Sequence, residues 1–279
     1  MSRDEILSRL RSEYMGRSLY YYEETDSTNL RIRQLADEGA DEGTLAVSDM
    51  QTAGRGRRGR GWISPPGMNI YMSLLLKPDI APSDAPMITI IMAMAVCDAV
   101  CDMVGGAGVV PGADRETPDV RIKWPNDIVV NGRKVCGILT EMDMAGDRID
   151  RVTVGVGINV NQSDRDLFPQ DIRETATSLK LECGADVNRA VLIARIMEEF
   201  ERLYVRFVQK RNLGFMHDRY EERLAGLGNE VRVLDPQGEY TGVSRGITDR
   251  GELLVETADG TVQTVYAGEV SVRGLYGYT

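Results

Sequence analysis

The sequence is poor in histidine and cysteine and lacks the spacing with which these residues hold a metal ion. His217 is the only histidine among the 279 residues, and none of the four cysteines forms a C-x-x-C pair. A tetrahedral zinc site needs closely spaced Cys or His ligands, so no structural zinc is expected. Cys97 and Cys101 stand in one apolar run, where buried thiols are expected. The cysteine pattern disfavours a disulfide-stapled secreted domain and predicts a reducing cytosol.

Positive charge is scarce relative to negative charge. The chain has 33 Lys and Arg against 43 Asp and Glu, a net charge of −10. Such a chain repels polyphosphates at long range, which argues against a protein that coats DNA or RNA. The first residues alternate charges and lack the apolar region of a signal peptide. The apolar run over residues 85–97 is shorter than the about 20 residues of a membrane span, so we expect a buried helix in a soluble protein.

Hydrophobic periodicity divides the chain into a larger α+β part and a small β part. Asn131-Gly132 is a strong hairpin signal, because both positions tolerate positive φ. The expected helices are 2–15, a helix that begins at Asp26-Ser27-Thr28 and stops at Gly39, 86–104, 187–209 and 213–224. The expected strands are 20–24, 44–50, 69–76, 120–124, 128–130, 135–141 and 151–160, then 230–234, 239–247, 252–256, 262–266 and 270–273.

Five short strands in the last part of the chain are typical of a small barrel. We therefore predict a mixed-sheet domain over residues 1–226 and a small C-terminal β-barrel over residues 227–279. Residues 105–119 are rich in Gly and Pro and acidic, so we expect an exposed excursion without fixed structure.

The most unusual segment is the stretch from Gln51 to Trp62. Every residue between Gly54 and Gly61 is Gly or Arg. Glycines let backbone N–H groups approach an anion, and arginines donate bidentately to carboxylates or phosphates. A single copy flanked by strand patterns in an acidic chain favours a loop for a small anion over an RNA-binding arginine–glycine segment.

Three further segments place polar groups at strand ends or between strand glycines. In Lys123-Trp-Pro-Asn-Asp127 the lysine can neutralise phosphate and the carboxylate can hold Mg²⁺ or orient a group, although the pentapeptide alone fits a capped turn equally well. Lys134 opens a strand whose Gly137 leaves room for a ligand or a neighbouring backbone, and Asn159 follows the glycines of Gly155-Val-Gly157. The chain has neither a P-loop nor a dinucleotide fingerprint, so any nucleotide is bound in another way.

Together these segments resemble one family, the biotin–protein ligases, also called biotin–[carboxylase] ligases. The resemblance runs from about Thr25 to the end of the chain. GRGRRG followed by W, with KWPND later in the chain, is a highly specific combination. The matching segments are Asp26-Ser-Thr-Asn29, residues 51–62, Lys123-Trp-Pro-Asn-Asp127, residues 132–141, residues 155–160 and Gly268-Glu-Val-Ser-Val-Arg273.

The resemblance implies a catalytic domain of the biotin/lipoate ligase type with an SH3-like C-terminal barrel. It implies activation of biotin with MgATP to biotinyl-5′-AMP, and transfer to one lysine of a biotin carboxyl carrier domain of a biotin-dependent carboxylase. Mg²⁺ is expected to arrive with ATP, without a certain protein ligand. Neither DNA nor membrane is expected as a partner, and monomer and homodimer both stay open.

Site residues follow from the same resemblance, position by position. The catalytic residues are expected to be Lys134, Lys123, Arg57 and Asp127. Biotin is expected at Ser27, Thr28, Asn29, Gln51, Arg55, Gly56, Arg57 and Lys134. The adenylate and phosphates are expected at Arg57, Arg58, Arg60, Trp62, Lys123, Asn126, Asp127 and Asn159.

Two departures and two rivals accompany this interpretation. Bifunctional members carry a winged helix-turn-helix before the ligase core, and only about two dozen residues precede Asp26, so operon repression is not expected. The stretch 105–119 is longer than the connection expected there.

A lipoate–protein ligase shares the fold, but its loop is typically Arg-Arg followed by small residues. A non-catalytic biotin or RNA binder would not need Lys123 and Lys134 beside Asp127.

Overall fold

A computed structural model of the chain describes residues 1–105, 117–235, 238–267, 271–274 and 278–279. Most of the expected excursion over 105–119, the turn at 236–237 and the motif residues 268–270 lie outside the described residues. The described helices are α1 (Arg3–Arg9), α2 (Thr28–Asp37), α3 (Pro86–Gly105), α4 (Leu179–Cys183), α5 (Arg189–Lys210) and α6 (His217–Arg223).

A seven-stranded mixed sheet forms the centre of the larger part. Its spatial order is β1-β2-β3-β7-β6-β5-β4; β1 and β2 are parallel and all other neighbours are antiparallel. The strands are β1 (Leu19–Thr25), β2 (Leu45–Gln51), β3 (Ile70–Leu76), β4 (Val120–Lys123), β5 (Asp127–Val130), β6 (Arg133–Ala145) and β7 (Arg148–Ile158). Asn131 and Gly132 join β5 to β6 with φ of 49° and 75°, which confirms the predicted hairpin turn.

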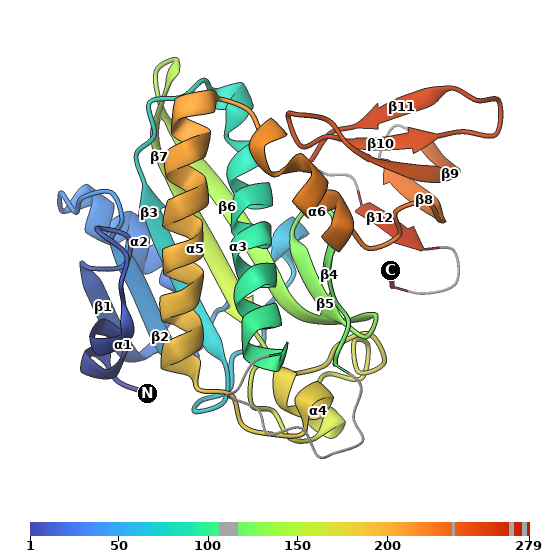
Figure 1. Cartoon of the computed structure of the whole chain (residues 1–279). Coiled ribbons are helices and arrows are strands. Elements are labelled where there is room, and N and C mark those ends of the chain that lie inside the picture. The colour runs from blue at the N-terminus through green and yellow to red at the C-terminus, as the bar shows by residue number, and fades with distance from the viewer. Residues whose placement is uncertain (106–116, 236–237, 268–270, 275–277) are drawn as a thin grey trace.

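Strand alternation gives this sheet two different faces. On β3, Leu74 and Leu76 belong to the main core, whereas Leu75 packs with Ile32 of α2 on the other side. The main-core face is covered by α3 and α5, which lie side by side in front of the sheet (Figure 1). The face that carries α2 is the one on which the site described below is built.

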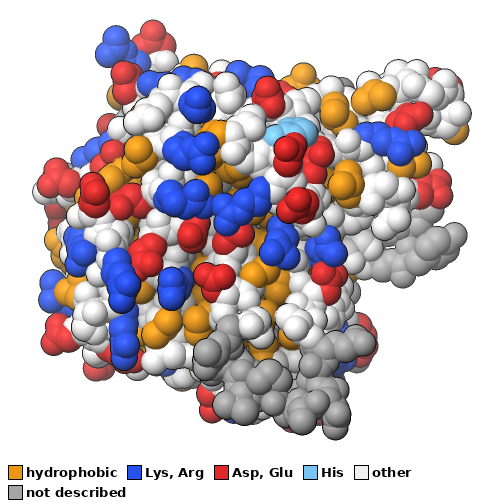
Figure 2. All heavy atoms as spheres, viewed as in Figure 1, with side chains coloured by type: hydrophobic (Ala, Val, Ile, Leu, Met, Phe, Trp, Pro, Cys, Tyr) orange, Lys and Arg blue, Asp and Glu red, His pale blue; other side chains and the backbone are white. Residues whose placement is uncertain are grey.

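Helix α3 is the buried helix that the apolar run predicts, and it extends further than the run itself. By length and composition it could cross a membrane, but 72% of its most apolar 18-residue stretch is buried within the molecule. Figure 2 shows the side of the molecule on which α3 and α5 lie, where acidic and basic side chains are mixed and apolar side chains are scattered between them. α3 is thus a core helix, packed against the sheet and against α5 beside it.

The C-terminal part forms a second, antiparallel sheet of five strands in the order β11-β10-β9-β8-β12. Its strands are β8 (Glu230–Asp235), β9 (Gly238–Ile247), β10 (Leu253–Glu256), β11 (Val262–Val265) and β12 (Ser271–Gly274). The α+β class and the five C-terminal strands are as predicted. Among the described residues the sheet is open, with β11 and β12 at its two edges.

The two expected helices with weak periodicity are shorter than predicted. The first ends at Arg9, where Leu10 takes up an extended conformation, and does not reach residue 15. The segment 213–224 begins with a 3-10 turn at Gly214–Met216, and only His217–Arg223 is α-helical.

Candidate active site

One cavity of about 880 Å³ gathers the segments that the sequence singles out. It lies over the α2 face of the sheet, at the ends of β2 and β4, over the first half of β6 and over the last residues of β7. Every predicted site residue lines it: Ser27, Thr28, Asn29, Gln51, Arg55, Gly56, Arg57, Arg58, Arg60, Trp62, Lys123, Asn126, Asp127, Lys134 and Asn159. The structure therefore brings the predicted residues together, while their individual roles stay predictions.

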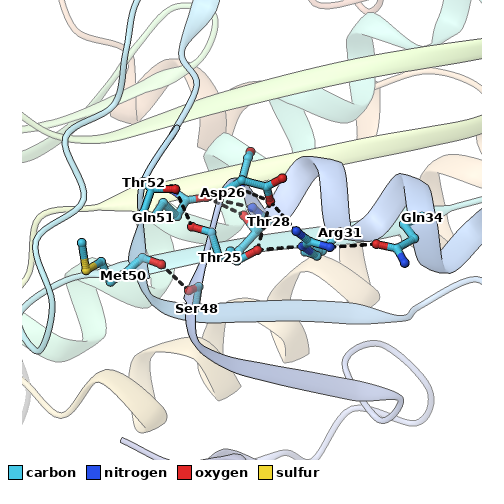
Figure 3. Close-up of polar contacts among 10 residues, drawn as sticks. Thr25, Asp26, Thr28, Arg31, Gln34, Ser48, Met50, Gln51 and Thr52 are labelled. Atoms are coloured by element: carbon cyan, nitrogen blue, oxygen red, sulfur yellow. Dashed lines mark hydrogen bonds and ion pairs between the residues drawn. The ribbon is translucent and has the colours of Figure 1, made fainter.

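The start of α2 forms one wall of the cavity. Ser27 is the N-cap residue but its side chain makes no capping hydrogen bond. Gln51 at the end of β2 takes over that function, because its Oε1 accepts a hydrogen bond from the Thr28 N–H at 2.9 Å. Figure 3 shows this contact beside the pairing of Arg31 with Asp26, 3.0 Å apart. The sequence D-S-T-N thus fixes a helix start at the cavity.

Asn29 reaches from α2 across the sheet. Its Nδ2 donates to Oε2 of Glu141 at 2.7 Å, and its Oδ1 accepts from the Ser73 hydroxyl at 2.6 Å. Gly155 makes this approach possible, since a Cβ there would lie 2.2 Å from Asn29 Oδ1. The first glycine of the Gly155-Val-Gly157 segment of β7 therefore accommodates a side chain of the site.

The arginine–glycine loop folds back on itself over the cavity. The Gly56 N–H donates to the Arg60 carbonyl at 2.7 Å, and the Trp62 N–H donates to the Gly54 carbonyl at 2.9 Å. Arg58 adopts a positive φ of 58°, which tightens the turn. Arg57 points inward and donates from Nη1 to Oδ1 of Asn126 at 2.6 Å. One arginine of the loop is thereby connected to the KWPND segment.

Trp62 lies on a floor of two paired glycines. Gly137 of β6 and Gly157 of β7 are register partners, and at both glycines the position that a Cβ would occupy faces the indole ring. A Cβ on Gly157 would lie 2.6 Å from Cε2 of the ring, so only glycine allows this contact. The indole Nε1 is buried without a hydrogen-bond acceptor among the described residues.

A buried charge cluster closes the other end of the cavity. Lys123 ends β4 and Asp127 begins β5, and the two are register partners across the short connection through Asn126. Lys134 Nζ lies 2.7 Å from Oδ1 of Asp127. Burial raises the pKa of Asp127, but Lys134, Tyr278 and Lys123 outweigh it and hold that pKa below its usual value. The Asp127 carboxylate is therefore ionised at neutral pH.

Burial also changes the pKa of Lys123, the lysine opposite Asp127. It lowers this pKa to about 8, although the negative charge of Asp127 acts in the other direction. Lys123 is thus a cation that can lose its proton just above neutral pH. The described residues contain no group of three or more Asp, Glu, His or Cys that could hold a metal ion.

Several residues of the site carry no signal in the sequence motifs. Ser73 of β3 holds both Thr28 and Asn29, yet it is a lone polar residue in an apolar strand. The segment before α4 lines the cavity with Leu167, Phe168 and Ile172 and shows no regular periodicity. Tyr278, from the last described residues, also enters the site. Strand alternation could have indicated Ser73, but neither of the other two had a detectable pattern.

Comparison with known proteins places the chain among the biotin and lipoate protein ligases. The model of the biotin/lipoate A/B protein ligase family matches residues 21–159, and that of the biotin protein ligase C-terminal domain matches residues 226–273. The chain belongs to the biotin protein ligase branch of this family, as the motifs predict.

Individual relatives agree along nearly the whole chain. A Bacillus subtilis protein named bifunctional ligase/repressor BirA is 38% identical over 98% of this chain and 79% of its own length. The biotin–[acetyl-CoA-carboxylase] ligase of Mycobacterium tuberculosis is 33% identical over 94% of this chain and 93% of its own. The structure of the Aquifex aeolicus biotin protein ligase in complex with biotin and ATP superposes with a TM-score of 0.76 at 30% identity, over 92% of this chain and 99% of that one.

Proposed function

We propose that the chain is an ATP-dependent, AMP-forming biotin–protein ligase. The carboxylate of biotin attacks the α-phosphorus of ATP, which forms biotinyl-5′-AMP and releases pyrophosphate. An amine of a carrier-domain lysine then attacks the acyl carbon, which forms an amide and releases AMP. The acceptor is the biotin carboxyl carrier domain of a biotin-dependent carboxylase.

The observation that carries the proposal is the meeting of Arg57, Lys123 and Lys134 in one cavity with a glycine-lined floor. Two anions, a carboxylate and a triphosphate, must approach each other for the first step. Their repulsion is offset by fixed cations, which also stabilise the charge that develops on the α-phosphate. A non-catalytic binder would not need cations at both positions.

The cavity fits the substrates in size and chemistry. A volume of about 880 Å³ falls in the range of small-molecule sites. The indole of Trp62, which covers the floor at Gly137 and Gly157, lines the cavity and offers a flat surface to an apolar ring system. An oxygen of a bound ligand could accept a hydrogen bond from the buried Trp62 Nε1.

We assign the residues as their positions suggest. Biotin binds at the α2 wall and the loop backbone, through Ser27, Thr28, Asn29, Gln51, Arg55 and Gly56, with Arg57 and Lys134 near its carboxylate. The adenylate and phosphates bind at Arg58, Arg60, Trp62, Lys123, Asn126, Asp127 and Asn159, again with Arg57. Asn159 also holds the neighbouring segment before α4 in place, because its Nδ2 donates to the Thr177 carbonyl at 3.1 Å.

Mg²⁺ would arrive coordinated by the phosphate oxygens of ATP. Asp127 is the carboxylate closest to the two lysines of the site, and Lys134 already occupies its Oδ1. Mg²⁺ is commonly held by one or two carboxylates together with substrate phosphates and water, which fits this donor set. When bound, the ion would supply positive charge that stabilises the phosphates during the release of pyrophosphate.

The wider assignments are a cytoplasmic protein without a DNA or membrane partner. They are supported by the net charge of −10, by a long apolar helix that is buried in the core, and by four cysteines that form no disulfide. We also propose that the catalytic domain ends near residue 226 and that the C-terminal domain follows from residue 227.

One assay separates the proposal from its rivals. Purified protein with ATP and Mg²⁺ is expected to release pyrophosphate when biotin is added but not when lipoate is added. A carrier domain with its acceptor lysine is then expected to gain one biotinyl group. Release with lipoate alone would indicate a lipoate ligase, and no release with either acid would indicate a binding protein.

A further inference from the structure

Tyr278 reaches the charge cluster from outside every sequence motif. It follows β12, the edge strand of the C-terminal sheet, whose label lies beside the end of the chain in Figure 1. Its hydroxyl donates to Oδ2 of Asp127 at 2.5 Å. Its ring carries the Lys123 ammonium, with Nζ 3.3 Å from the ring centroid. A single side chain thus contacts both the anion and one cation of the cluster.

These contacts complete the environment of Asp127. Its Oδ1 already accepts from Lys134 Nζ at 2.7 Å and from Asn126 Nδ2 at 3.1 Å. Tyr278 engages the other oxygen, so the carboxylate is held at both oxygens and cannot rotate without breaking a hydrogen bond. The direction in which Lys134 presents its remaining protons is fixed along with it.

The contact with Lys123 is of a different kind. The face of an aromatic ring attracts a cation, and more strongly when the pair is removed from water. Lys123 is only 9% exposed, and the face of the Tyr278 ring covers its ammonium group without offering a hydrogen-bond acceptor atom to its N–H donors. The ammonium therefore keeps its hydrogen-bonding capacity for a ligand while its position is fixed.

We propose that Tyr278 is a positioning residue for the ATP-dependent half-reaction. It orients Asp127 through its hydroxyl and Lys123 through its ring, so that both lysines are in place for the phosphates of ATP. The inference rests on the proposed function, because it concerns the same reaction. It makes a residue beyond the C-terminal sheet part of the support for the activation chemistry.

The test separates the two contacts by comparing Tyr278→Phe with Tyr278→Leu. The phenylalanine keeps the ring over Lys123 and loses the hydroxyl, whereas the leucine loses both. Loss of one hydrogen bond to a charged group predicts a fall of about ten-fold in kcat/KM for ATP in Tyr278→Phe. A larger fall, about a hundred-fold, is expected in Tyr278→Leu. Tyr266→Phe is the matched control, since Tyr266 is 67% exposed on the same part of the chain.

Two readouts distinguish positioning from a merely structural role. Biotin affinity and the transfer of biotin from added biotinyl-5′-AMP to the carrier domain need no triphosphate, so both are expected to fall much less than kcat/KM for ATP. In an Asp127→Asn background, Tyr278→Phe is expected to add no penalty, because its hydroxyl acts through that carboxylate.

Every other outcome overturns the inference. An equal loss in both half-reactions, an additive penalty with Asp127→Asn, or loss of the native thermal transition in Tyr278→Phe would assign Tyr278 to folding. Tighter ATP binding in Tyr278→Leu would make Tyr278 a competitor of the phosphates. A wild-type protein that releases no pyrophosphate with biotin would contradict the proposed function itself, which is a separate result from an active Tyr278→Phe variant.

Discussion

At the scale of single residues, the two lysines of the site differ in how they are held. Lys134 is paired with Asp127 and its side chain is 25% exposed, whereas Lys123 is 9% exposed and lies against an aromatic ring. Lys134→Ala and Lys123→Ala are each expected to depress pyrophosphate release. Lost hydrogen bonds from a charged group cost about 1.5–3 kcal/mol, or roughly ten- to a hundred-fold in rate. Lys180→Ala, which removes a surface pair with Asp186, is the control.

The measurement is the initial rate of biotin-dependent pyrophosphate release at several ATP concentrations. A near wild-type rate for either alanine variant would remove that lysine from the site. Lys134→Ala is expected to weaken biotin binding as well, because it removes the cation nearest to the proposed biotin carboxylate. Lys123→Ala is expected to affect ATP alone.

The lowered pKa of Lys123 leads to a prediction about pH. Burial places this pKa at about 8, so the ammonium is present below that pH and is lost as the pH rises through it. Phosphate needs the protonated form, and kcat/KM for ATP is therefore expected to fall on the alkaline side of about pH 8. Lys123→Arg keeps its charge at every such pH, so this alkaline limb should disappear in the variant. An unchanged limb in Lys123→Arg would assign it to another group.

At the scale of elements, hydrophobic pattern and turn chemistry predicted most of the fold. The buried helix α3, the amphipathic helix α5 and the hairpin at Asn131 have strong local signals, and the structure has all three. Helix ends were less predictable. Arg9 ends α1 although charged residues continue, because the backbone N–H groups of Arg11 and Glu13 donate instead to side chains of α5. A tertiary contact of this kind leaves no periodic trace in the sequence.

Site residues that belong to a sequence motif could be predicted, whereas site residues that only the fold brings to the cavity could not. The arginine–glycine loop and KWPND are specific enough to identify the family, and their residues do meet in one cavity. Ser73 and Tyr278 came from the structure, since one lies within an apolar strand and the other near the end of the chain. Both contact motif residues across long sequence separations, which no local pattern records.

The loop itself supports a prediction about the intermediate. Biotinyl-5′-AMP is a mixed anhydride that water or any amine can attack, so the enzyme must enclose it. Arg57 ties the loop to Asn126, and Arg57→Gly removes that contact and adds backbone freedom. The variant is expected to form the adenylate still but to release it, and to biotinylate bystander lysines at high biotin concentration.

The adenylate dissociation rate and the selectivity for the carrier lysine are the quantities to measure. Arg148→Gly, an exposed arginine at the start of β7, is the control for loss of a charge and gain of a glycine. Equal dissociation rates and equal selectivity in Arg57→Gly and the wild type would show that Arg57 does not close the loop.

At the scale of the whole molecule, the C-terminal sheet is joined to the core through a residue of the site motif. Trp124 of KWPND is 4% exposed, and its Nε1 donates to the Gly251 carbonyl, between β9 and β10, at 2.8 Å. Nearby, Arg250 pairs with Asp84 at 2.7 Å. The segment that places Lys123 and Asp127 therefore also docks the C-terminal sheet, and the two parts are expected to unfold in one cooperative transition.

Trp124→Phe tests this coupling. The variant keeps an aromatic ring but leaves the Gly251 carbonyl without its donor, which costs about 1–3 kcal/mol for a buried group. Since a loss of 1 kcal/mol lowers Tm by about 2–4 °C in chains of 150–250 residues, a fall of several degrees is expected by calorimetry. Trp62→Phe is the matched control, because the Trp62 Nε1 has no acceptor among the described residues and its loss is expected to leave Tm nearly unchanged. Equal Tm values for the two variants would show that the Trp124 contact does not hold the C-terminal sheet to the core.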